Sequence, residues 1–177
     1  MSQQLNIATL PLVLCGPILR RVTEDSVSVF VATKHPRHLI LRIYPSTSAN
    51  ETPIPAFEGE TETVPLGTHL HVAVVTARAA GTKLSPGTVY GYDVSFEKMT
   101  GPHPSIDVNV LDTQPNQVQF GGLGLLDGEM PLGYDTHDRP GFALSPTDIA
   151  KVNLLHGSCR KPHGGGPDML TIADFLL

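Results

Sequence analysis

The chain has 177 residues, of which 40% are hydrophobic and 16% are charged, and its net charge at pH 7 is −5. This length suffices for one packed domain, or for one domain and part of another. The acidic balance and the lack of a basic stripe argue against a nucleic-acid partner, because phosphate binding needs clustered cations. The 17 Gly and 16 Pro, together with no Trp, favour a β-rich fold with many turns.

The first apolar stretch, residues 7–16, is not preceded by any Lys or Arg. The positively charged start of a secretion signal is therefore missing, and no segment reaches the length of a membrane span. We expect a cytoplasmic protein without a membrane segment. Its two cysteines, Cys15 and Cys159, are then expected to be unpaired thiols, and a disulfide between them is the alternative.

Alternating apolar residues predict a succession of strands up to residue 98. The predicted strands cover 13–22, 26–33, 38–44, 60–64, 70–77 and about 88–97. Gly16-Pro17 interrupts the first strand and predicts an edge or a bulge there, whereas 60–64 is expected to be a weak edge strand. The residues expected to face inward are Val27, Val29 and Val31; Leu39, Leu41 and Ile43; and Leu70, Val72 and Val74.

The last of these strands contains the most specific fold signal. Tyr90 shares a face with Tyr92 and Phe96, and the opposite face, with Asp93 and Ser95, is expected to be mostly solvated. The pattern Leu-x-Pro-x-Thr-x-Tyr that ends at Tyr90 resembles the tyrosine corner of fibronectin type III sandwiches, where the hydroxyl bonds to the backbone upstream. We therefore expect an all-β sandwich of the fibronectin type III or immunoglobulin-like class over residues 1–98. The alternative is that Tyr90 is a core aromatic residue of another β fold.

Residues 99–150 are rich in Gly and Pro and break this rhythm. We expect a long insertion before the last sandwich strand, or a linker that covers a neighbouring domain. Residues 151–177 then predict a strand at Val152–Leu155, a loop and a helix that begins near Met169. On one earlier strand, His69 and His71 are two residues apart, and we expect an exposed pair rather than a metal site.

The loop His156-Gly-Ser-Cys-Arg-Lys-Pro-His-Gly-Gly-Gly-Pro-Asp168 gathers groups that bind metals and anions. Cys159 closes the strand as a candidate metal ligand, and its neighbours Arg160 and Lys161 favour the thiolate form. His163 and Gly165 lie where a Gly-rich loop meets a helix N-terminus, which suits a phosphate group. A buried free thiol and an ordinary helix start are the alternative interpretations.

The segment from Leu154 to Asp168 resembles the opening of the metallophosphatase domain in PhoD-like proteins, the alkaline phosphatase D family. The resemblance implies an N-terminal fibronectin-like sandwich followed by an α/β metallophosphoesterase domain. It also implies that Cys159 is a metal ligand, in a centre of iron and calcium that activates a hydroxide against a phosphate ester. The parent protein would then be a hydrolase, a phosphatase or phosphodiesterase.

The family's remaining metal ligands begin with a Gly-Asp-Gln motif downstream, and this sequence contains no such motif. One Cys and one or two His cannot hold several metal ions and orient water. We therefore expect a truncated accessory fragment that lacks its C-terminal phosphatase domain, is inactive alone and binds no metal stably. The alternative function is a fibronectin-like binding module for proteins or glycans, acting through loops 45–59 or 99–150.

Overall fold

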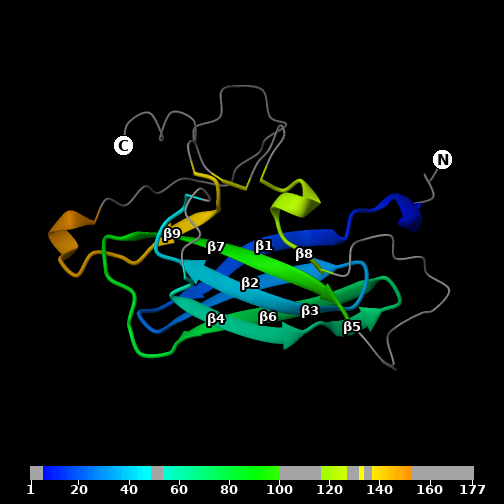
Figure 1. Cartoon of the computed structure of the whole chain (residues 1–177), viewed down its shortest axis with the longest axis horizontal. Coiled ribbons are helices and arrows are strands. Elements are labelled where there is room, and N and C mark those ends of the chain that lie inside the picture. Colours follow the sequence, from blue (N-terminus) through cyan, green and yellow to red (C-terminus); the bar gives the residue numbers. More distant parts are fainter. Residues whose placement is uncertain (1–5, 49–53, 100–116, 127–131, 134–136, 153–177) are drawn as a thin grey trace, which may run out of the picture. The chain divides into compact units, whose positions relative to one another are not determined.

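The computed structural model describes residues 6–48, 54–99, 117–126, 132–133 and 137–152. The chain divides into two compact units, Met1–Leu144 and Ser145–Leu177. The first unit contains the strands β1 Val13–Val22, β2 Ser26–Thr33, β3 Arg37–Tyr44, β4 Phe57–Glu62, β5 Val64–Gly67, β6 Leu70–Ala79, β7 Val89–Lys98, β8 Gln117–Val118 and β9 Gly141–Ala143 (Figure 1). The described helices are single 3₁₀ turns at Ile7–Thr9 (η1), Gly121–Leu123 (η2) and Ile149–Lys151 (η3), the last in the second unit. Among the described residues, no helix is long and apolar enough to cross a membrane.

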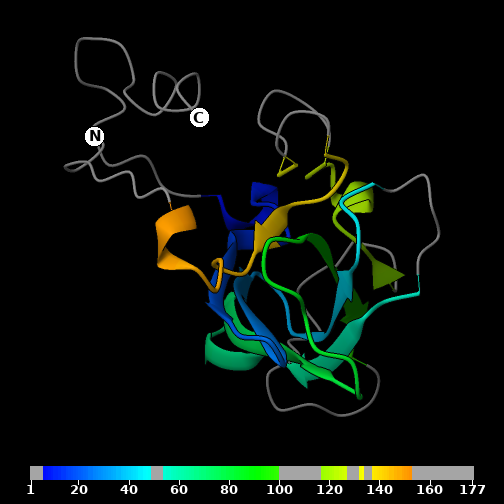
Figure 2. The same cartoon turned by 90° about the vertical axis from the view of Figure 1, so that its left-hand side faces the viewer.

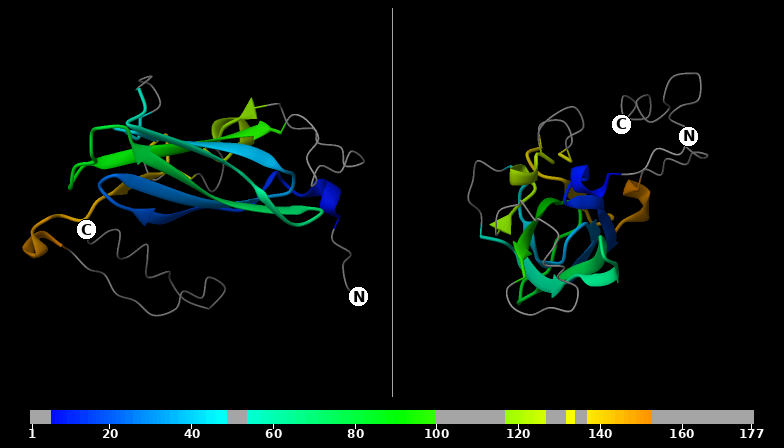
Figure 3. Two further views of the ribbon diagram at one scale, coloured as in Figure 1. Left: turned by 90° about the horizontal axis from the view of Figure 1, so that it is seen from below. Right: turned by 90° about the vertical axis from the view of Figure 1, so that its right-hand side faces the viewer.

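The first unit is an all-β fold, built from a single antiparallel sheet that curls around its core (Figures 2 and 3). The strand order is β1-β2-β6-β4-β3-β7-β8, with β5 added beside β6 and β9 beside β7. β4 joins the two halves of the sheet, because it pairs with β3 along its whole length and with β6 through Phe57 and Glu58. The strand predicted at 60–64 is thus displaced to Phe57–Glu62, and the expectation of an edge strand is wrong.

The curl requires a close approach of β4 to β6 at Gly59. A Cβ atom at this position would overlap the carbonyl oxygen of Thr76 and lie 2.8 Å from the Cα of Ala77. Only glycine leaves room for the two backbones to cross at this corner. The residue that was expected to precede an edge strand therefore marks the place where the sheet folds over.

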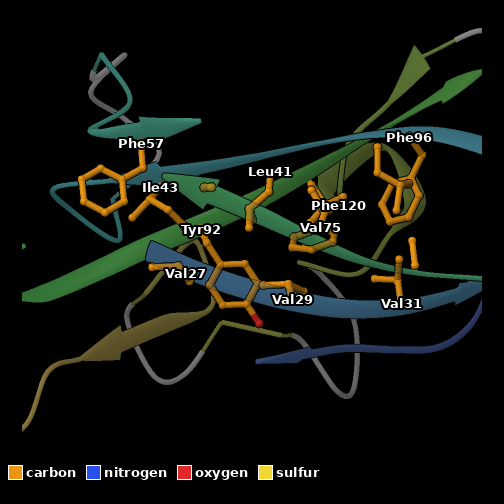
Figure 4. Packing of buried hydrophobic residues seen from close by; sticks show 14 of the residues in the cluster. Val27, Val29, Val31, Leu41, Ile43, Phe57, Val75, Tyr92, Phe96 and Phe120 are labelled. Atoms are coloured by element: carbon orange, nitrogen blue, oxygen red, sulfur yellow. The ribbon is translucent and has the colours of Figure 1, made fainter. Parts of the chain in front are cut away.

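The core lies inside the curl, and the alternation in β2 and β3 fills it as predicted. Val27, Val29 and Val31 of β2 are completely buried, as are Leu39, Leu41 and Ile43 of β3. On β7, the aromatic face formed by Tyr90, Tyr92 and Phe96 is also buried. Figure 4 shows Tyr92 and Phe96 among the buried side chains of the other strands. Because successive side chains of a strand point to opposite faces, apolar residues at every second position line the face that is turned toward the core.

In β6 the prediction of the inward face is wrong. Val74 is 54% exposed and Leu70 is also exposed, whereas Ala73, Val75 and Ala77 are buried. The register with β2 sets this choice, because Val75 lies opposite the buried Val29. Both faces of β6 are apolar, so its alternation alone could not decide which one turns inward.

The strand β1 forms one edge of the sheet, and its pairing with β2 shifts at the predicted position. The register slips between Cys15 and Ile18, on either side of Gly16-Pro17. Gly16 has a φ of 95°, and a Cβ there would lie 2.7 Å from the carbonyl oxygen of Phe30. The expected bulge on an edge strand is present, and glycine suits its left-handed backbone.

The first compact unit extends to Leu144, and it includes two short strands from the segment that was expected to be an insertion or a linker. β8 pairs with β7 through Phe96 and Val118, and β9 pairs with β7 through Tyr90 and Phe142. Phe120 is completely buried and Phe142 nearly so, and both belong to the hydrophobic core. Two short strands from the Gly- and Pro-rich segment therefore pair with β7, and the core receives Phe142 from β9 and Phe120 from the residues just after β8.

Candidate functional site

The residues expected to bind metal and phosphate lie outside the described residues. This holds for Cys159, Arg160, Lys161, His163 and Gly165 alike. Within the described part of the chain, no three His, Cys, Asp or Glu side chains gather in a way that could hold a metal ion. The expected site therefore stays a prediction from the sequence, and the described geometry concerns the sheet that precedes it.

Tyr90 has the hydrogen bond that a tyrosine corner requires. Its hydroxyl accepts the backbone N–H of Ser85 at 2.8 Å, five residues upstream. Its buried ring stacks on Phe142, with centroids 5.8 Å apart and planes inclined by 25°. The bond ties the connection between β6 and β7 to the start of β7, and the turn at Gly87 supplies a positive φ of 75° for the reversal.

The opposite face of β7 contains a polar cluster that was expected to be solvated. Asp93 and Ser95 are instead buried, so that expectation is wrong. The cause lies in the segment after β8: the backbone N–H of Phe120 donates to Asp93 Oδ1 at 3.2 Å, and Gln119 Nε2 donates to Ser95 Oγ at 3.2 Å. Because both faces of β7 are covered, the alternation of its residues alone does not reveal that the face with Asp93 and Ser95 is buried.

Arginine side chains complete this cluster from the neighbouring strand and from the segment before β9. Arg42 Nη1 donates to Ser95 Oγ at 3.0 Å, while its Nε pairs with Glu58 Oε2 at 2.7 Å. The Arg139 guanidinium carbon lies 4.2 Å from the centre of the Tyr44 ring. Arg139 also donates from Nη1 to the carbonyl oxygen of Ser48 at 2.7 Å, which ties two loops together.

The electrostatics of Asp93 reflect its burial against the segment that follows β8. Burial raises the pKa of its carboxyl group, and this effect outweighs the opposing hydrogen bonds from the backbone N–H groups of Phe120 and Val94. The positive charges of Arg139 and Arg42 also oppose the rise. Because the buried carboxylate accepts the backbone N–H of Phe120, it holds the segment after β8 against β7.

The two histidines at the start of β6 are not an exposed pair. His71 is completely buried, and His69 lies in the turn between β5 and β6. In the register of β6 with β2, His71 lies opposite Thr33 on the inner face, whereas His69 precedes the strand. The expectation that both are exposed is therefore wrong for His71.

Sequence reasoning missed the cluster around Asp93 because β7 is flanked on both faces. The signal available was the series of small or polar residues Gly91, Asp93 and Ser95, which leaves space for another segment to lie over the strand. A Cβ at Gly91 would in fact lie 2.7 Å from the carbonyl oxygen of Ser46. Such an approach of two backbones explains why glycine stands at that position.

Comparison of the chain with models of protein families, with curated proteins and with solved structures found no match in any of the three.

Proposed function

We propose that this chain is the N-terminal accessory portion of a PhoD-like metal-dependent phosphoesterase, and that its strands form a fibronectin type III-like sandwich. The strand order supports the fold: β1, β2 and β6 stand on one side, and β3, β7 and the pair β8 and β9 stand on the other. The hydrogen bond of Tyr90 supports it further. In this proposal β4 bridges the two layers.

The sequence motif at residues 154–168 is the observation that carries the proposal. Cys159 would supply one thiolate ligand to a centre of iron and calcium, and the other donors would come from the phosphatase domain that follows. The bound metals would supply the hydroxide that attacks a phosphate ester. Arg160, Lys161 and His163 carry the positive charge or N–H groups that attract phosphate oxygens, and Gly165 lets the backbone approach them.

In this proposal the sandwich supports the active site without providing reacting groups. Asp93 is the described carboxyl group whose pKa burial raises, and it is covered by the segment that it binds. The chain of 177 residues alone should therefore be inactive, because a site with several metals needs more ligands than it contains.

The test measures hydrolysis of p-nitrophenyl phosphate and bis-p-nitrophenyl phosphate by the full gene product and by residues 1–177. We expect turnover by the full product only, and its loss in Cys159→Ala. Cys15→Ala is the matched control, because Cys15 is an exposed free thiol on β1. Full activity of Cys159→Ala, or turnover by residues 1–177 alone, would contradict the proposal.

A binding module without catalytic activity, with a protein or glycan as partner, is the second candidate function. The exposed aliphatic side chains on β5 and β6, among them Val64, Leu66 and Val74, favour a protein partner over a glycan. Binding of a protein by the full gene product that survives Cys159→Ala, with no metal present in that product, would favour this function.

A further inference from the structure

We draw no further inference here: the strongest candidate, the exposed apolar patch on the outer face of strands β1, β2, β5 and β6, carries nothing, because nothing in the described part of the structure shows what covers it.

Discussion

Removing the hydroxyl of Tyr90 tests the tyrosine corner directly. Tyr90→Phe keeps the ring that stacks on Phe142, but it deletes the acceptor that lies 2.8 Å from the backbone nitrogen of Ser85. A partly buried N–H left without an acceptor costs about 1–3 kcal/mol. We expect a loss near the lower end, about 1–1.5 kcal/mol, because this bond lies partly in contact with water.

Equilibrium unfolding in urea measures this loss. With a slope of about 2 kcal/mol per M, the midpoint of Tyr90→Phe should fall by about 0.5–0.8 M. Tyr92→Phe is the matched control, since Tyr92 lies two residues away on the same buried face and its hydroxyl bonds to no described residue. Its free energy of unfolding should change by less than about 0.5 kcal/mol. Equal losses in the two variants would refute the assignment of the corner to Tyr90.

Two further predictions concern the folding corner and the buried carboxyl group. Gly59→Ala should destabilise the first unit by about 1–3 kcal/mol, because the new methyl group would meet the backbone of Thr76, whereas Gly67→Ala, with no atom within 4 Å of its Cβ, should change little. A thermal melt compares the two, and equal melting temperatures would contradict the predicted overlap. Asp93→Asn keeps an oxygen for the N–H of Phe120 but cannot ionise. Because burial raises the folded pKa of Asp93 above 3.8, the wild type loses stability as the pH rises through that pKa, so the advantage of Asp93→Asn should grow from pH 3 to pH 7. If the stability advantage of Asp93→Asn over the wild type shrinks over this range, the pKa of Asp93 is not raised by folding.

The sequence predicted the inward faces of β2, β3 and β7 because most bulky apolar residues of each strand lie on one face, although Phe30 of β2 and Ile40 of β3 lie on the other. It could not predict the inward face of β6, where His71, Ala73 and Val75 compete with larger residues on the other side. That choice depends on the register with β2, which is a tertiary property.

The central position of β4 in the sheet could not be predicted from the sequence pattern either. A short strand of alternating Glu and Thr looks like an edge, but the close approach at Gly59 places it between β3 and β6. The late part of the unit was missed for a similar reason, since Phe120 and Phe142 are isolated in a Gly- and Pro-rich segment. Neither has the periodic neighbours from which a strand is predicted.

The candidate site could likewise be predicted only in part from the sequence. Tyr90 was predicted from a local motif, because a tyrosine corner is formed within a few residues of the chain. The cluster around Asp93 was missed, because Gln119 and Phe120 reach it from more than twenty residues away in the sequence. The prediction for Cys159 was also local, but its test lies in the chemistry of the full gene product.

The metal content of the full gene product tests the central functional claim most directly. Inductively coupled plasma mass spectrometry of the purified product should find iron and calcium. The iron should be lost in Cys159→Ala and retained in Cys15→Ala, whose thiol is exposed on β1. A product without bound iron, or one in which Cys159→Ala retains it in full, would contradict the assignment of Cys159 as a ligand and with it the phosphoesterase proposal.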